Sequence, residues 1–250
     1  MIPLLLAVSL CYARPLQIAD LRLEPTDTPF SVCGHDRHRV SQMQKDQCLH
    51  IIGELDHWYE VTIPEQSVGH SIWINSSIRG WVHKRNVVKA GRCSCRSFPK
   101  RTLSLRDRKR IVLQAREYVG QAYLWGGLTW ANPSSVITTG VNCSGLVYQS
   151  YVSVGFLLPR RSPDQCAVGM PIEPQELLPG DLIFYAPVAR PVKHVMMWTG
   201  SDLIESYMSF PGGSVRLISF EERFGVALSS VKDGDIVQGK ILFFRRYGEE

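Results

Sequence analysis

The sequence from about residue 17 to residue 90 has no stretch with the apolar spacing of a helix. Short runs rich in β-branched and aromatic residues alternate there with polar turns, as in Trp58-Tyr59-Glu60-Val61. We expect strands at residues 48–55, 58–63, 71–74 and 81–88. Short strands joined by turns are typical of a small all-β barrel. This part of the chain is therefore expected to build its core from paired strands.

From residue 104 onward the pattern changes to helices followed by strands. Ser104 with Asp107 three residues later is close to a capping box at a helix start, and Gly120 provides a stop. A second helix is expected to begin near Cys143 and to end at Gly155. Strands are expected at residues 182–186, 192–198, 203–207, 214–218 and 240–246. This order predicts an α+β domain over residues 105–250.

The composition is that of a globular chain with one strongly basic segment. The chain has 250 residues, of which 44% are apolar and 20% are charged, which is too apolar for a disordered protein and long enough for two small cores. We expect no transmembrane segment. Between residues 84 and 110 there are eleven bases and one acid, a local charge of +10 within a net charge of +5. We interpret residues 92–104 as a basic interdomain linker.

The N-terminal residues 1–13 have the character of a leader. They are apolar from Ile2 to Leu10 and end in Cys11-Tyr12-Ala13, a small-x-small pattern that predicts a signal peptide cleaved before Arg14. No Lys or Arg precedes the apolar run, so a short buried segment stays an alternative. Cleavage would place the protein in the periplasm or cell envelope, and an uncleaved leader would leave it in the cytoplasm.

The cysteine and histidine pattern does not predict a metal site. Cys33, His35, His38 and Cys48 are the one set that resembles metal ligands, but the second ligand pair of a zinc site is missing. We interpret them as a polar loop with buried thiols. Cys93-x-Cys95 is interpreted as a pair of free or redox-sensitive thiols. No glycine-rich nucleotide loop or flavin motif is present, so we expect no cofactor.

A nucleophile is predicted where the second helix begins, at Asn142-Cys143-Ser144-Gly145. A thiol in the first turn of a helix faces unpaired backbone N–H groups, which favour the thiolate, the attacking form. The small neighbours Ser144 and Gly145 let a substrate carbonyl approach closely. Taken alone, however, a single cysteine is usually a small buried apolar residue.

The general base is predicted to be His194, because the other six histidines lie between residues 35 and 83. It begins a strand, and Glu205 follows eleven residues later in a second strand beyond a turn at Thr199 to Asp202. An antiparallel hairpin would bring the Glu205 carboxylate near the imidazole, where it could orient the ring and stabilise the imidazolium. A structural histidine and a solvated glutamate are the alternatives.

Two successive parts of the chain each resemble a known family. Residues 14–91 resemble a bacterial SH3-like domain through Trp58-Tyr59-x-Val61, a hairpin, and Gly80-Trp81-Val82-His83. The second part resembles the NlpC/p60 family over about 140 residues. The motifs that carry this second resemblance are Tyr123-Leu124-Trp125-Gly126-Gly127, Asn142-Cys143-Ser144-Gly145-Leu146-Val147, Leu158-Pro159-Arg160-Arg161-Ser162, Leu178-Pro179-Gly180-Asp181-Leu182-Ile183-Phe184 and His194-Val195.

The NlpC/p60 resemblance implies a papain-like cysteine endopeptidase of the bacterial cell wall. It implies Cys143 as nucleophile, His194 as base, Tyr123 beside the oxyanion and Trp125 as a wall of the pocket. It also implies substrate contacts at Asn142, Ser144, Arg161 and Ser162. The implied reaction is hydrolysis of the bond between D-γ-glutamate and a diamino acid such as meso-diaminopimelate in peptidoglycan stem peptides, through a thioester.

Three residues depart from the family pattern. Asn142 stands where an aspartate is common, and Arg161 stands where members that recognise a free L-Ala amine tend to have an aspartate. Glu205 occupies the place of the third triad residue, which is usually His, Asn or Gln. One residue fewer separates it from the histidine than in the family pattern. The two negative charges lost at Asn142 and Arg161 put recognition of an N-terminal ammonium in doubt.

Two other functions stay open. Asn142 and Arg161 favour an amidase or acyltransferase that uses the same thiol chemistry on another substrate. The SH3-like domain favours a catalytically degenerate cell-wall binding protein. The basic segment is either a solvated linker and helix face or a strip that holds anionic wall polymer. It lacks aromatic residues apart from Phe98, so we expect no nucleic-acid binding.

Overall fold

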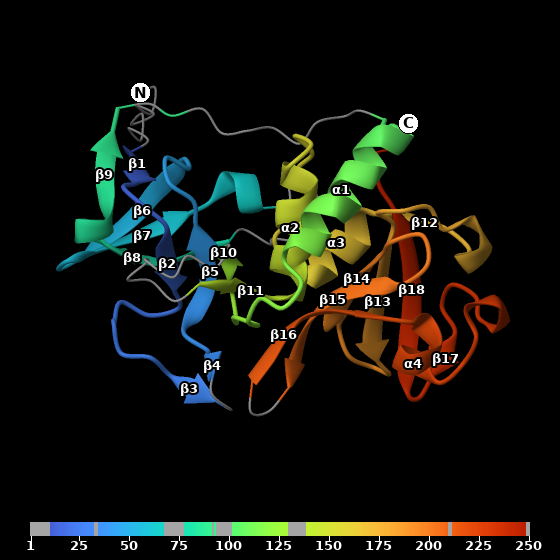
Figure 1. Ribbon diagram of the computed structural model, residues 1–250. Coiled ribbons are helices and arrows are strands. Elements are labelled where there is room, and N and C mark those ends of the chain that lie inside the picture. Colours follow the sequence, from blue (N-terminus) through green and yellow to red (C-terminus); the bar gives the residue numbers. More distant parts are fainter. Residues whose placement is uncertain are drawn as a thin grey trace, which may run out of the picture.

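Two antiparallel sheets lie on either side of a group of helices in the computed structural model (Figure 1). The structure describes residues 11–32, 35–67, 78–91, 93, 102–129, 139–209 and 212–248. The N-terminal sheet is coloured blue to teal in Figure 1, and the C-terminal sheet is orange to red. The presence of both helices and strands confirms the predicted α+β class.

The N-terminal sheet has seven strands in the order β5-β2-β8-β7-β6-β1-β9. Its apolar side chains form one core, in which Leu21, Leu49, Val61 and Val82 are fully buried. No pairing joins β5 to β9 within the described part of the chain, so the predicted closed barrel is not shown. The strands are β1 (Cys11–Pro15), β2 (Ala19–Arg22), β5 (Arg39–Met43), β6 (Leu49–Leu55), β7 (Trp58–Thr62), β8 (Arg79–His83) and β9 (Val87–Ala90), with a separate β3 (Ser31–Val32) and β4 (His35–Asp36) hairpin.

The predicted strands of this half agree with the structure in part. β6 and β7 match two predictions, and the predicted strand at 71–74 lies outside the described residues. The predicted strand at 81–88 is broken by a 3-10 turn, η2 (Lys84–Asn86), which separates β8 from β9. At its start the backbone N–H of Arg85 donates to His83 Nδ1 over 3.2 Å, so a side chain supports the break. A second 3-10 turn, η1 (Pro64–Gln66), follows β7.

Strand β1 overlaps the predicted leader. Residues 1–10 lie outside the described residues, but Tyr12 and Ala13 pair with both β6 and β9, and Ala13 is fully buried. Cleavage before Arg14 would remove three residues of a strand that lies inside the sheet. The leader and its cleavage therefore stay predictions, and the N-terminal sheet begins at Cys11 rather than Arg14.

The C-terminal sheet follows the order β12-β18-β13-β14-β15-β16, with β17 paired to β18. All five strands predicted for this half are found. The strands are β12 (Met170–Pro171), β13 (Leu182–Pro187), β14 (His194–Trp198), β15 (Leu203–Ser209), β16 (Gly212–Ile218), β17 (Ile236–Val237) and β18 (Lys240–Arg246). A short pair, β10 (Leu128–Thr129) and β11 (Gly140–Val141), lies beside α2 and near β5.

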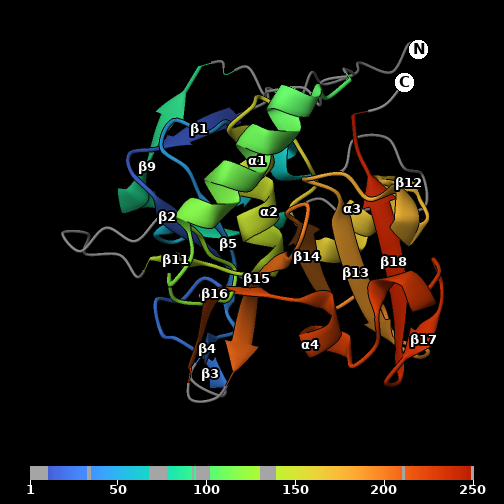
Figure 2. The same ribbon diagram turned by 45° about the vertical axis from the view of Figure 1, so that its right-hand side comes forward.

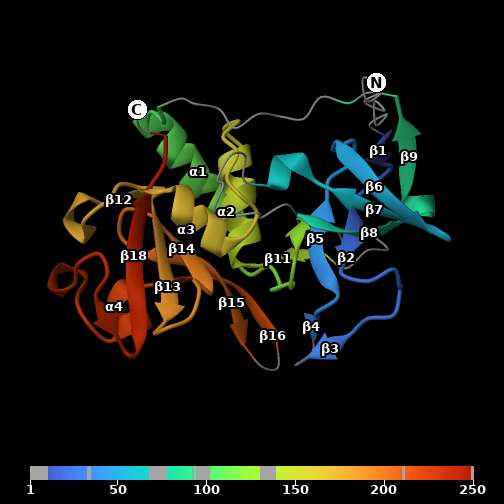
Figure 3. The same ribbon diagram turned by 180° about the vertical axis from the view of Figure 1, so that it is seen from behind.

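In the part of the chain that the structure describes, four helices accompany this sheet. α2 lies at the centre of the molecule in the views turned by 45° and by 180° from that of Figure 1 (Figures 2 and 3). α2 contacts α1, β14 and β15 and buries Leu146, Val147 and Tyr151 in the main core. None of the helices in the described residues is long and apolar enough to cross a membrane. The helices are α1 (Leu105–Glu117), α2 (Cys143–Val152), α3 (Ser162–Val168) and α4 (Phe220–Phe224), with 3-10 turns η3 (Pro174–Glu176) and η4 (Leu228–Ser230).

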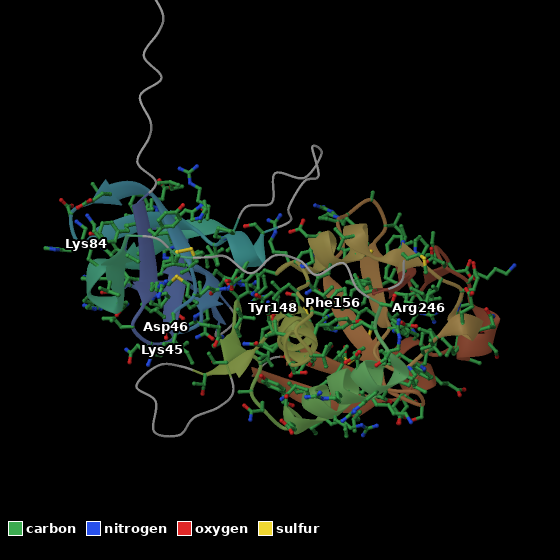
Figure 4. All side chains as sticks on the ribbon, turned by 90° about the horizontal axis from the view of Figure 1, so that it is seen from above. Lys45, Asp46, Lys84, Tyr148, Phe156 and Arg246 are labelled. Atoms are coloured by element: carbon green, nitrogen blue, oxygen red, sulfur yellow. A yellow bond between two sulfur atoms is a disulfide. The ribbon has the colours of Figure 1, made fainter. Side chains whose placement is uncertain are left out.

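The predicted cysteine states need correction. Cys93 is not a free thiol, because it forms a disulfide with Cys48, visible as a yellow bond in the N-terminal half in Figure 4. The pairing joins residues 45 positions apart, so sequence proximity gave no sign of it. It also removes Cys48 from the metal-like set. Cys33 and Cys95 lie outside the described residues.

A buried ion cluster joins α1 to the sheet. The carboxylate of Asp181, fully buried at the start of β13, accepts from Arg108 Nη1 over 2.7 Å and from Arg246 Nη2 over 2.7 Å. Arg246 is labelled at the C-terminal side of Figure 4. Arg108 is one of the eleven bases of the basic segment, but its side chain is buried and its charge is paired with Asp181.

Replacing Asp181 with alanine is expected to lower the free energy of unfolding by about 3–5 kcal/mol, because two buried guanidinium groups lose their carboxylate. Urea unfolding followed by circular dichroism measures the change. Glu60→Ala is the control, since its 2.7 Å ion pair is with the exposed Arg79, and it is expected to lower the free energy of unfolding far less. Equal losses in the two variants would contradict a stabilising role for the cluster.

Candidate active site

Cys143 is the first residue of α2, as its sequence neighbours predict. Asn142 caps the helix, with its side-chain oxygen accepting from the N–H of Gly145 over 2.9 Å. A Cβ atom on Gly145 would lie 2.2 Å from the carbonyl oxygen of Gly127, so only glycine fits there. The Gly-Gly turn at 126–127 and the start of α2 are thus in direct contact. The Cys143 side chain is buried, with 7% of its surface exposed.

The predicted hairpin brings His194 and Glu205 together. β14 and β15 pair antiparallel, and the turn between them is closed by the N–H of Thr199 donating to the carbonyl of Asp202 over 2.8 Å. His194 Nε2 lies 2.6 Å from Glu205 Oε2. Because Nε2 is taken by the carboxylate, Nδ1 is the ring nitrogen left for Cys143. The three residues therefore form a connected row from α2 through β14 to β15.

Glu205 is fully buried and held by two arginines besides His194. Arg216, opposite it on β16, donates to Oε1 over 2.8 Å, and Arg223 of α4 lies 3.1 Å from the same oxygen. Burial alone would raise the pKa of Glu205. The hydrogen bond and charge of His194, with the charge of Arg223 and a hydrogen bond from Arg216, lower it to about 2. The carboxylate is therefore ionised at neutral pH.

The thiol and imidazole favour the ion pair over the neutral pair. Burial lowers the pKa of His194, but Cys143 and Glu205 together raise it to about 9. Burial raises the pKa of Cys143, but the charge and hydrogen bond of His194 outweigh it and the pKa is lowered. The backbone N–H groups of Val195 and Ser144 also donate to the sulfur and contribute to this lowering. Both shifts favour the thiolate–imidazolium pair over the neutral pair.

Tyr123 and Trp125 lie beside this pair. The backbone of Tyr123 bridges to Val141, next to the start of α2, and burial raises the pKa of its hydroxyl, which stays protonated. The guanidinium of Arg37 lies 3.8 Å above the Trp125 ring centroid, and Arg39 Nη1 donates to the Trp125 carbonyl over 3.3 Å. Both arginines come from the N-terminal half, so this half holds Trp125 in place.

Arg160 is the residue whose importance the sequence did not reveal. It is 2% exposed, and its guanidinium donates to three neutral oxygens: Ser41 Oγ over 3.0 Å, Ser144 Oγ over 3.0 Å and the Gly127 carbonyl over 3.1 Å. No carboxylate pairs with it among the residues that the structure describes. Burial lowers the pKa of Arg160 to about 10, while the nearby Cys143 favours its charged form. Its place in the motif Leu158-Pro159-Arg160-Arg161-Ser162 was the one available signal.

The two other predicted substrate residues lie at the start of α3. Arg161 precedes the helix and pairs with Asp164 over 2.9 Å. Ser162, the first residue of the helix, is buried.

All predicted site residues except Glu205 line one cleft of about 670 Å³. Glu205 does not line the cleft, but it is hydrogen-bonded to His194, which does. The cleft is also lined by residues that the sequence did not identify, from both halves of the chain: Leu23, Arg37, Arg39, Val40, Tyr185, Val192, Lys193, Tyr207 and Met208.

No set of three or more His, Cys, Asp or Glu residues that could hold a metal ion occurs in the part of the chain described here.

Comparison with known proteins identifies the segment that carries this site. Residues 120–209 match the model of the NlpC/P60 family. The NlpC/p60 resemblance is confirmed for this segment. It contains Tyr123, Cys143, His194 and Glu205, whereas the N-terminal sheet and the basic segment lie outside it. The resemblance of residues 14–91 to an SH3-like domain is therefore not tested.

The similar proteins include enzymes named for peptidoglycan cleavage. The chain is 38% identical over 96 residues to peptidoglycan endopeptidase RipB of Mycobacterium tuberculosis, covering 36% of this chain and 39% of RipB. It is 34% identical over 93 residues to the bifunctional muramidase/DL-endopeptidase CwlT of Bacillus subtilis, covering 36% of this chain and 26% of CwlT. The matches thus span less than half of these relatives.

A solved NlpC/P60 family protein from Bacillus cereus aligns with 96% of this chain and 64% of its own, at 21% identity and a TM-score of 0.46. At that score the similarity adds nothing to the sequence match.

Alkylation by iodoacetamide is expected to distinguish Cys143 from Cys166. Both are buried to a similar degree, at 7% and 9% exposed. The pKa of Cys143 is lowered by His194, whereas burial raises the pKa of Cys166 to about 11. At pH 7 Cys143 should react at least about 100-fold faster, because only the thiolate attacks. Peptide mass spectrometry over pH 5–9 measures both rates, and equal reactivity would contradict the ion pair.

Proposed function

We propose that the protein is a cysteine endopeptidase that hydrolyses the D-γ-glutamyl–diamino acid bond of peptidoglycan stem peptides. The observation that carries the proposal is the row Cys143, His194 and Glu205, whose first two members line one cleft, inside the segment that matches the NlpC/P60 family. A buried thiolate beside an imidazolium is suited to acyl transfer. The names of RipB and CwlT support peptidoglycan as the substrate.

The reaction begins with attack of the Cys143 thiolate on the scissile carbonyl carbon. The carbonyl oxygen becomes an oxyanion, which the backbone N–H of Cys143 can stabilise because the first N–H groups of α2 have no partner within the helix. The protonated Tyr123 hydroxyl is the second donor on this side. His194 then gives its proton to the leaving amine, and the peptide bond breaks to leave a thioester on Cys143.

Hydrolysis of the thioester uses the same groups in reverse. His194, now neutral, takes a proton from water, whose oxygen attacks the thioester carbon and releases the thiolate. Glu205 keeps its charge throughout and holds the imidazole ring with Nδ1 toward the sulfur. Trp125 forms a wall of the cleft, and Ser144 and Ser162 are proposed to contact the substrate peptide.

An amidase or acyltransferase is the second candidate, favoured by Asn142 and Arg161, which leave the entrance of the cleft without carboxylates. Product masses from a muropeptide mixture separate the two, because an amidase releases whole stems from the sugar. A catalytically degenerate wall-binding protein has no need of a low-pKa thiol paired to an imidazole, and the row of three residues argues against it.

Cys143→Ala is expected to abolish muropeptide cleavage, a loss of about 10⁴-fold or more, because no other group in the row can form the thioester. Cys166→Ala is the matched control and should retain activity. Chromatography and mass spectrometry of digested muropeptides report the products, and circular dichroism checks that both variants fold. Cleavage by Cys143→Ala, or intact muropeptides after incubation with reduced wild-type protein, would contradict the proposal.

The pH profile of kcat/KM is expected to fall above about pH 9. The pKa of His194 is raised to about 9, so the imidazolium that protonates the leaving amine is lost as the pH rises through that value. Glu205→Gln removes the negative charge that raises this pKa, so its upper limb should move to lower pH and its activity should fall about 10²-fold or more. An unmoved upper limb would exclude Glu205 as the third residue of the triad.

The basic segment is proposed to hold anionic wall polymer near the site. Arg106, Lys109 and Arg110 are exposed on α1, while residues 92, 96, 100 and 101 lie outside the described residues. Activity on intact sacculi should then fall steeply between about 50 and 200 mM salt, since exposed charges are screened, while activity on small soluble peptides should change less. Equal salt dependence on both substrates would favour a merely solvated segment.

A further inference from the structure

The cleft at Cys143 carries cations and no carboxylate. Five of its lining side chains are basic, and within the described residues none is acidic. They come from three different walls: the N-terminal sheet, the segment before α3, and the segment before β14. The five are Arg37, Arg39, Arg160, Arg161 and Lys193.

Two of these five charges are neutralised from outside the cleft. Arg39 pairs with Asp20 over 2.8 Å, and Arg161 pairs with Asp164 over 2.9 Å. Neither carboxylate lines the cleft. Two of the five basic side chains are thus neutralised, and three uncompensated positive charges remain in the cleft. The Cys143 thiolate does not reduce this number, because the His194 imidazolium balances it.

The three remaining cations have no ion pair in the described part of the chain. Arg160 is fixed at the base of the cleft by neutral oxygens of Ser144 and Gly127. The Arg37 guanidinium lies with one face on Trp125, which leaves its N–H edge without a carboxylate. Lys193 is exposed next to His194.

An ammonium group would find no carboxylate among the described residues that line this cleft, and the Cys143 thiolate already faces the His194 imidazolium. The Asn142 side-chain oxygen is occupied by the N–H of Gly145, and Ser144 Oγ is occupied by Arg160. The other acceptors are neutral hydroxyls, such as that of Ser162. A carboxylate, in contrast, would meet guanidinium or ammonium groups on both sides.

We infer that the cleft selects stem peptides that carry free carboxylates and a blocked N-terminus, and that it rejects stems with a free N-terminal ammonium. The inference rests on the proposed function and specifies its substrate. In the cell wall the stem's N-terminus is blocked by its amide bond to the sugar. The enzyme must therefore act before any reaction that cuts that amide, because such a reaction creates the ammonium.

Matched synthetic peptides test this directly. The first is L-Ala-D-γ-Glu-meso-diaminopimelate with an acetylated N-terminus, the second has a free N-terminus, and the third is acetylated with the D-Glu α-carboxylate converted to an amide. The acetylated carboxylate peptide is expected to have a kcat/KM at least about tenfold above both others. Isothermal titration with Cys143→Ala measures binding of the same three peptides without turnover.

Charge-reversal variants test which residues cause the preference for the acetylated peptide. Arg37→Glu and Lys193→Glu are expected to narrow or reverse the preference for the acetylated peptide, mainly through the free-amine peptide becoming a better substrate. Lys232→Glu makes the same change of charge at an exposed residue that does not line the cleft, and it should leave the preference unchanged. Iodoacetamide labelling of Cys143 checks that each variant keeps an intact site.

The outcomes separate this inference from the proposed function. Tighter binding of the acetylated carboxylate peptide without cleavage of any peptide would support the charge selection and overturn the endopeptidase proposal. Equal or tighter binding of the free-amine peptide, or no binding of the acetylated one, would overturn the charge selection whether or not the peptides are cleaved. An unchanged preference in both charge-reversal variants would also overturn it.

Discussion

The buried guanidinium of Arg160 is the interaction on which the assembly of the site depends. Its N–H groups reach Ser41 in the N-terminal sheet, Ser144 in α2 and the Gly127 carbonyl, and its own backbone N–H donates to the Gln66 carbonyl. A buried charge is stable only when its donors are satisfied. Separating the two halves would expose Arg160 and loosen its hold on Ser144, the residue after Cys143, and on Gly127. Packing of the halves and preorganisation of the nucleophile are therefore one event.

The charges around Arg160 continue as an alternating series through the site. Arg160 is followed by the Cys143 thiolate, the His194 imidazolium and the Glu205 carboxylate, and Glu205 is followed by two arginines, Arg216 and Arg223. Burial opposes each charge by itself. Because Cys143, His194 and Glu205 each lie between opposite charges, the charged form of each one is favoured. Nucleophilicity at Cys143 is therefore a property of the series and extends to α4, 80 positions along the chain.

The sequence predicted the features that are determined by residues close together in the chain. It missed the contacts between residues that are far apart in the chain. The cap at Ser104, the helix start near Cys143 and the hairpin that joins His194 to Glu205 were predicted, because capping and turn signals lie within a few residues. Strands β2 and β5 were missed because ADLR and RVSQM lack a clear apolar alternation. Helix α4 has five residues, too few for a periodic signal.

The disulfide and Arg160 were missed for a related reason. Cys48 and Cys93 are 45 positions apart, and Arg160 lies 119 positions from Ser41. The disulfide follows from the strand order of the N-terminal sheet, in which β1 separates β6 from β9, and the Arg160 contact follows from how the two halves pack. No local pattern contains that information. Motif resemblance located Cys143 and His194 because the motif itself surrounds the reacting groups. The motif at residues 158–162 gave Arg160 no role, because its side-chain partners Ser41, Ser144 and Gly127 lie in other parts of the chain.

The two halves of the chain contribute different groups to the cleft. One half contributes the groups proposed to react with the substrate, and the other contributes basic side chains proposed to select it. The segment that matches the NlpC/P60 family holds the nucleophile, the imidazole and the carboxylate. Arg37 and Arg39, which come from outside that segment, bring positive charge to the opposite wall and hold Trp125 between them. Proteins that share the matched segment can therefore share the thiol chemistry and still differ in the substrate they accept, because the wall that adds these charges belongs to a different part of the chain. In this protein the N-terminal half lines the cleft as α2 does.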